Sequence, residues 1–135
     1  AQPVKAGGSD ISAYRVAKGI LDEAGVVAIL PEGTRAFDGV MAEPKPGVSM
    51  LATRTGTPVL PVGISGTDDL IAREQVLPNI GSRIILRVGR PFTLSIPKGA
   101  HRRAALAAAD EEMMRRIAAL VEPRHRGRWE PWPEQ

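Results

Sequence analysis

The sequence VVAILPEGTR, at residues 26–35, joins five consecutive apolar residues to a short polar stretch. Residues 26–30 show no alternation of apolar and polar positions, which predicts a strand that is buried on both faces. Pro31 lacks the N–H group that sheet pairing requires, so we expect the strand to end there. The polar residues would then follow the carboxyl end of a buried strand, where ligands usually bind in open α/β sheets.

The polar residues after this strand have the chemistry of a site for a small polyol phosphate. Gly33 lets the backbone approach a ligand closely, because it has no side chain. Arg35 offers a planar guanidinium that fits two phosphate oxygens, and Glu32 can accept hydrogen bonds from hydroxyl groups. On the residues alone, an ordinary turn is an equally good interpretation, since PEGT is a common turn composition.

Three stretches of the chain resemble signature blocks of the glycerolphosphate and lysophosphatidate acyltransferases. LPEGTR at residues 30–35 resembles the third block, which usually reads FPEGTRS, and it is the specific part of the likeness. DG at residues 38–39 with KPG at 45–47 resembles the continuation of that block. PVLPVGI at residues 58–64 resembles the fourth block. The likeness extends over about residues 3–90.

The resemblance implies an enzyme of phospholipid biosynthesis that moves a fatty acyl group from acyl-CoA or acyl carrier protein to the hydroxyl of a lysophosphatidate or similar glycerol phosphate. It assigns acceptor binding to five residues: Glu32, Gly33, Thr34, Arg35 and Lys45. It implies no cofactor, and no His and carboxylate cluster in the sequence has the spacing of metal ligands. The expected partners are the acyl donor, the lysophospholipid acceptor and a peripheral membrane contact, without nucleic acid.

The catalytic base of this family has no counterpart in the sequence. Acyl transfer needs a base near the acceptor hydroxyl, and the family supplies it as the His of a His-x4-Asp block. Neither His101 nor His125 is followed by an Asp at that spacing, and we expect both on the surface. We therefore predict that the chain holds no catalytic residue and is inactive alone.

Two functions remain open at this point. The chain is either the acceptor-binding half of an acyltransferase or a non-catalytic module that binds anions or lipids. A His-x4-Asp block encoded upstream of Ala1 would favour the enzyme.

The fold class expected from the order of the elements is α/β, with a central mixed sheet flanked by helices. We expect it to be acyltransferase-like and incomplete at its amino end. Apolar periodicity and terminal glycines predict helices over residues 11–24, 48–55 and 101–122, with a short helix at 68–75. Strands are expected over residues 26–30, 59–64 and 83–88, with Pro61 at an edge, a bulge or a strand end. Residues 1–122 would form the C-terminal part of an acyltransferase domain.

Residues 123–135 form a basic tail that contains Trp129 and Trp132. The tail could pack on the body, stay disordered or lie at a lipid interface, and its lack of a helical moment favours the first two. The net charge of +3 and the pI near 9.8 suit anionic substrates or a lipid surface. The sequence has no cysteine and no apolar run near the roughly 18 residues of a membrane span. We expect no signal peptide and a cytoplasmic location, with contact to the cytoplasmic membrane face.

Overall fold

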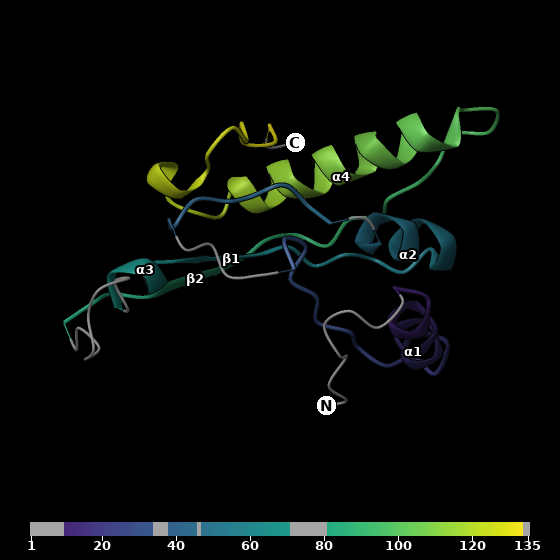
Figure 1. Cartoon of the computed structure of the whole chain (residues 1–135), viewed down its shortest axis with the longest axis horizontal. Coiled ribbons are helices and arrows are strands. Elements are labelled where there is room, and N and C mark those ends of the chain that lie inside the picture. The colour runs from purple at the N-terminus through teal and green to yellow at the C-terminus, as the bar shows by residue number, and fades with distance from the viewer. Residues whose placement is uncertain (1–9, 34–37, 46, 71–80, 134–135) are drawn as a thin grey trace.

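The computed structural model describes residues 10–33, 38–45, 47–70 and 81–133, which combine helices with one small sheet (Figure 1). The elements of this part of the chain are, in order, α1 (Asp10–Asp22), α2 (Val48–Thr55), β1 (Val62–Ser65), α3 (Thr67–Leu70), β2 (Ile85–Val88), α4 (Arg102–Ala118) and the 3-10 helix η1 (Pro123–His125). The three main predicted helices are confirmed. Most of the short helix expected at residues 68–75 lies outside the described residues.

The sheet consists of β1 and β2, which run antiparallel with Val62 opposite Val88 and Ile64 opposite Leu86. Before β1, the chain already pairs at one point, because Val59 and Phe92 exchange both backbone hydrogen bonds. Pro61 separates this bridge from β1, since it cannot donate to the ladder. The strand expected over residues 59–64 is therefore split at the proline.

The described residues show only this two-stranded sheet. The combination of helices with a sheet is thus confirmed, whereas the larger central mixed sheet stays a prediction.

The core lies between α4 and the elements beneath it. α4 runs along one side of the strands and contacts both α2 and β1, while α1 packs against α2 (Figure 1). The buried cluster contains Ala52, Leu94, Ala109, Met113, Met114, Ala118 and Trp129. It is aliphatic apart from the tryptophan, as the low aromatic content requires.

The two faces of the sheet differ in their cover. Gly63 faces the end of α4 so closely that an added Cβ would lie 2.7 Å from the Cβ of Leu120. The opposite face carries four apolar side chains that share a side through the strand register: Val62, Ile64, Leu86 and Val88. These side chains are 39–61% exposed. The described part of the chain therefore covers one face of the sheet and leaves the other open to water.

The buried strand expected over residues 26–30 is not formed, and that prediction is wrong for this structure. The segment has no regular secondary structure, and Val26 and Leu30 are 91% and 75% exposed. An apolar strand of this kind needs neighbouring strands for its backbone and cover on both faces. The described sheet pairs only β1 with β2 and supplies neither.

The glycine after the first predicted helix, Gly25, is expected in the left-handed conformation, but the left-handed residue at the end of α1 lies one position earlier. Ala24, and not Gly25, has the left-handed conformation, with φ of 58°. The N–H of Gly25 donates to the carbonyl of Ile20 at 2.8 Å, and the N–H of Ala24 donates to Leu21 at 3.1 Å, which is the pattern of a Schellman motif. Gly25 is needed for space, because an added Cβ would lie 2.7 Å from the Ile20 side chain.

Asp110 provides a test of the α2–α4 packing. Burial raises the pKa of the Asp110 carboxyl above its usual 3.8, and a hydrogen bond with the buried Ser49 of α2 offsets this in part. The Oδ1 atom is buried without a hydrogen-bond partner among the described residues. The ionised side chain therefore destabilises the fold, and this cost builds up as the pH rises from the unfolded pKa toward the higher folded pKa.

We expect Asp110→Asn to raise the melting temperature by a few degrees at pH 7. Well below pH 3.8 the Asp110 carboxyl of the wild type is protonated in both the folded and the unfolded chain. The gain in melting temperature should therefore disappear in acid. Thermal unfolding at pH 7 and near pH 3 measures this difference. Asp22→Asn is the control, since Asp22 is an exposed carboxylate paired with Lys18. An equal gain at both pH values would show that the charge of Asp110 is not the cause.

Candidate functional site

The polar loop after residues 25–30 is a tight turn whose geometry requires glycine. The N–H of Gly33 donates to the carbonyl of Leu30 at 3.0 Å, and Gly33 has φ of 69°. A Cβ at this position would lie 2.7 Å from Cδ of Lys45. Gly33 is therefore required both for its conformation and for the close passage of a neighbouring side chain.

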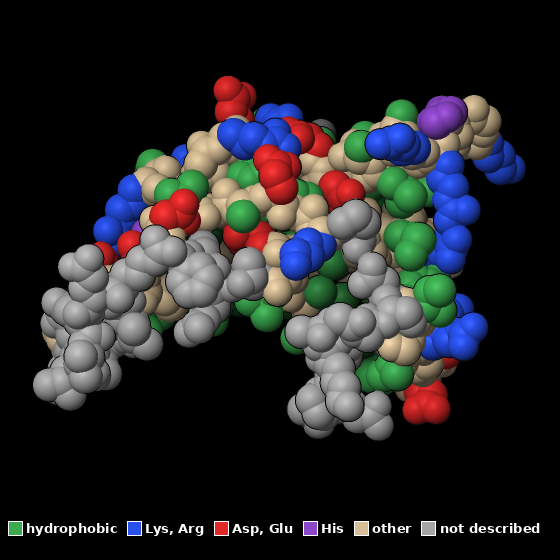
Figure 2. Space-filling model, in the orientation of Figure 1, with side chains coloured by type: hydrophobic (Ala, Val, Ile, Leu, Met, Phe, Trp, Pro, Cys, Tyr) green, Lys and Arg blue, Asp and Glu red, His purple; other side chains and the backbone are tan. Residues whose placement is uncertain are grey.

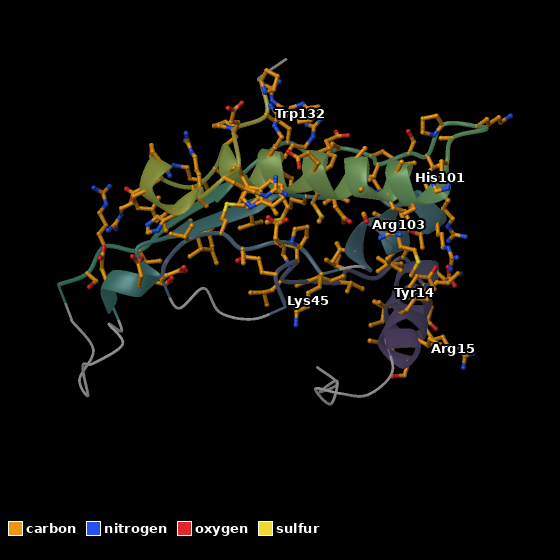
Figure 3. All side chains as sticks on the ribbon, turned by 45° about the horizontal axis from the view of Figure 1, so that its top comes forward. Tyr14, Arg15, Lys45, His101, Arg103 and Trp132 are labelled. Atoms are coloured by element: carbon orange, nitrogen blue, oxygen red, sulfur yellow. The ribbon has the colours of Figure 1, made fainter. Side chains whose placement is uncertain are left out.

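Lys45 lies beside this turn although it is twelve positions further along the sequence. Its N–H donates to the carbonyl of Pro31 at 2.8 Å, and its aliphatic stem runs past Gly33. The side chain is exposed and points away from the ribbon, on the side opposite α4 (Figure 3). The structure thus places the ammonium group of Lys45 at the edge of the turn that ends at Gly33, called the glycine turn below, where an anion can reach it.

Glu32 is tied to the same region through its carboxylate. Its Oε2 atom accepts a hydrogen bond from the N–H of Ala42 at 2.7 Å. Glu32 therefore joins the turn to the segment that carries Lys45. The structure brings Glu32, Gly33 and Lys45 together, while the predicted site residues Thr34 and Arg35 lie outside the described residues. The binding roles of all five stay predictions.

The segment between Asp38 and Lys45 takes its shape from its own turn. Oδ1 of Asp38 accepts from the N–H of Val40 at 3.1 Å, and Gly39 has φ of 70°. A Cβ at Gly39 would lie 2.8 Å from the carboxylate of Asp68. The DG pair at residues 38–39 is thus explained by a tight turn against α3.

The C-terminal tail packs on this segment. The sequence leaves open whether the tail packs on the body, stays disordered or lies at a lipid interface. The tail folds back along α4 (Figure 1), where the N–H of Trp132 donates to the carbonyl of Arg115 at 3.0 Å. Trp129 is 3% exposed. Arg128 forms a bidentate ion pair with Glu43, and its guanidinium lowers the pKa of that carboxyl. The tail is therefore an ordered part of the body over the described residues 123–133.

The surface position expected for His125 is wrong. The residue is 5% exposed, its Nδ1 lies 2.6 Å from the carbonyl oxygen of Gly39, and its Nε2 faces Asp68 and Glu122 at 3.8 and 3.7 Å. His101 is exposed as expected and lies at the start of α4, away from Lys45 (Figure 3). Neither histidine is placed to take a proton from a ligand beside Lys45.

The described residues give little further chemistry. They contain no group of three or more His, Cys, Asp or Glu side chains that could hold a metal ion. None of the helices described is long and apolar enough to cross a membrane. On the face shown in Figure 2, acidic and basic side chains are interspersed over the upper middle, whereas basic side chains and a histidine predominate at the right-hand end.

Comparisons with known proteins give the class to which these features belong. Residues 5–65 match the family model described as Acyltransferase. The resemblance that residues 30–35 indicate is thus confirmed. A comparison with curated proteins gave no match.

A solved structure gives a more particular likeness. The chain is similar to the 1-acyl-sn-glycerophosphate (LPA) acyltransferase PlsC from Thermotoga maritima, with 31% sequence identity and a TM-score of 0.56. The match covers 82% of this chain and 46% of that chain. The chain therefore spans less than half the length of this relative.

Proposed function

We propose that this chain is the acceptor-binding part of an acyltransferase that moves a fatty acyl group from acyl-CoA or acyl carrier protein to the hydroxyl of lysophosphatidate or a similar glycerol phosphate. The observation that carries the proposal is the meeting of Glu32, Gly33 and Lys45 at one turn within the region that matches the acyltransferase family. The likeness to PlsC, whose title names it an LPA acyltransferase, supports the choice of acceptor.

In this proposal, each residue of the turn and its neighbourhood contributes a different interaction to the binding of a phosphate ester. Lys45 supplies an exposed positive charge, and Gly33 lets the stem of Lys45 pass close to the turn. Arg35 supplies the guanidinium fork that fits two phosphate oxygens, and Thr34 adds a hydroxyl. Glu32 accepts from the acceptor's hydroxyl groups or fixes the turn through Ala42. Binding of a lipid acceptor would bring the protein to the cytoplasmic face of a membrane.

The base belongs to a part of the enzyme that residues 1–135 do not contain. The acyltransferase resemblance implies a His-x4-Asp block in that part, with His accepting the proton of the acceptor hydroxyl. The alternative function is a non-catalytic anion or lipid module, which is favoured by the absence of a histidine beside Lys45 among the described residues. The two functions are distinguished by adding a polypeptide that contains a His-x4-Asp block. Acyl transfer should then appear if the chain is part of an enzyme, and should not appear if it is a binding module.

We expect Arg35→Lys to weaken the binding of glycerol 3-phosphate about tenfold. The substitution keeps the charge but loses the fork, and a hydrogen bond to a charged group contributes about 1.5–3 kcal/mol. Lys45→Ala should weaken binding about two- to fivefold, because exposed ion pairs contribute up to about 1 kcal/mol. Titration of the isotope-labelled chain, followed by backbone amide chemical shifts, measures both affinities.

Matched controls exist for both substitutions. Arg90→Lys and Lys98→Ala change exposed residues on other loops and should leave the affinity unchanged. Equal affinity of all four variants and the wild type would count against an acceptor site at residues 32–45.

A further inference from the structure

Ala42 connects the C-terminal tail to the site through two adjacent backbone groups. Its N–H donates to Oε2 of Glu32 at 2.7 Å. Its carbonyl accepts a hydrogen bond from Nε1 of Trp129 at 3.3 Å. One residue therefore lies between a buried indole in the tail and the carboxylate of the glycine turn.

The same segment receives further bonds from the tail. The N–H of Met41 donates to the carbonyl of His125 at 2.8 Å, and the His125 ring bonds the carbonyl of Gly39. Glu43 is paired with Arg128. The tail thus contacts four of the five residues from 39 to 43 by polar interactions.

The tail is itself held by the folded core. Trp129 packs in the buried cluster with Met113 and Met114 of α4. Near the start of the tail, the N–H of Glu122 donates to Oγ of the buried Ser65 in β1 at 3.1 Å. The positions of the tail's donors are therefore fixed by α4 and by the sheet.

We propose that Trp129 and His125 are positioning residues of the acceptor site. They hold residues 39–43, and this segment in turn holds the carboxylate of Glu32 and carries Lys45 to the glycine turn. Neither side chain touches the acceptor. The inference rests on the proposed function for the role of the site, but the mechanical link from tail to turn is independent of it.

A purely structural role for the tryptophan can be separated from positioning, because its ring and its N–H are separate features. Trp129→Phe keeps a buried aromatic ring and removes the donor to the Ala42 carbonyl. Trp132→Phe is the matched control, since Trp132 belongs to the same tail but contacts Arg115 and Arg116 of α4. Among the described residues, no hydrogen bond joins Trp132 to residues 39–43.

The experiment measures three quantities on the isotope-labelled chain of residues 1–135. They are the hydrogen-exchange rate of the Ala42 amide, the carbon chemical shift of the Glu32 carboxyl, and the affinity for glycerol 3-phosphate. In Trp129→Phe we expect the Ala42 amide to exchange about three- to tenfold faster, which is the effect of one lost hydrogen bond. The Glu32 shift should move, and the affinity should fall about two- to fivefold. Trp132→Phe should match the wild type in all three.

His125 gives a second pair of variants if Trp129→Phe lowers stability too far. His125→Asn places an amide N–H where Nδ1 lies and keeps a donor for Gly39, whereas His125→Leu removes it. The asparagine variant should stay close to the wild type in Ala42 exchange and Glu32 shift, and the leucine variant should resemble Trp129→Phe.

The inference is overturned if Trp129→Phe and Trp132→Phe give the same Ala42 exchange and the same Glu32 shift. Failure of the proposed function has a different signature. In that case glycerol 3-phosphate binds no variant, the wild type included, while the Ala42 and Glu32 measurements still decide whether the tail positions the turn.

Discussion

Trp129→Ala is expected to lower the free energy of unfolding by about 3–5 kcal/mol, the usual loss when a buried aromatic side chain is truncated. Trp129 is 3% exposed and belongs to the same buried cluster as Leu94, Met113 and Ala118. Removing its ring leaves a cavity that the surrounding helix can fill only in part. Since domains of this size are stable by about 5–15 kcal/mol, this loss is a large fraction of the total stability. Urea denaturation followed by far-ultraviolet circular dichroism measures the loss.

Trp132→Ala is the control for this substitution. The ring of Trp132 is half-buried and lies 5.2 and 5.0 Å from the guanidinium carbons of Arg115 and Arg116. Its removal forfeits cation–π contacts of about 0.5–1 kcal/mol each at such exposed positions and leaves no enclosed cavity. A loss below about 1 kcal/mol for Trp129→Ala, or an equal loss for the two variants, would show that the tail is not part of the core.

The second large effect concerns catalysis. Residues 1–135 alone should transfer acyl groups at least about a hundredfold more slowly than a complete enzyme, because general base catalysis contributes about 10²–10⁴-fold. His125 is buried against Gly39, and His101 is exposed at the start of α4, so neither can serve a hydroxyl held beside Lys45. The sequence has no cysteine to act as a nucleophile. Weak binding of glycerol 3-phosphate should nevertheless persist.

The measurement is a thioester-cleavage assay with acyl-CoA, run with and without lysophosphatidate. The background is the double variant Glu32→Ala, Arg35→Ala, which lacks the proposed acceptor groups. Acceptor-dependent turnover above that background would contradict the prediction and would require a base among the residues assigned structural roles.

The helices could be predicted because their signals are local. Periodic apolar residues and the glycine after residue 55 act within one or two turns of the chain, and α2 ends with Gly56 in the left-handed conformation as expected. The apolar periodicity that predicts a helix within residues 101–122 agrees with the burial of Ala109 and Met113. Even here the offset at Ala24 shows that a glycine can be needed for space and not for its φ.

The strand at residues 26–30 could not be judged in the same way. Its apolar residues favour a buried strand. A strand forms, however, only where partner strands are present to pair with it. Among the described residues these partners are absent, so Val26 and Leu30 are exposed. The prediction failed because pairing depends on residues remote in sequence.

The tail was unpredictable for a related reason. The contacts of His125 with Gly39 and of Trp129 with Ala42 join residues separated by more than 80 positions. No local sequence pattern predicts these contacts. The two tryptophans, in a chain with only 4% aromatic residues, indicate only that large rings are available for burial. In the site itself, the motif indicated Gly33 and Lys45 together, and the structure places them in contact.

The open face of the sheet has a thermodynamic consequence. Unfolding normally raises the heat capacity because apolar surface becomes hydrated. Val62, Ile64, Leu86 and Val88 are already partly hydrated in the folded chain, so they add less to this increment, and to the dependence of stability on denaturant, than fully buried side chains would. The stability curve of the chain is therefore flatter than its length implies, and a polypeptide that covered this face would steepen the curve as it bound.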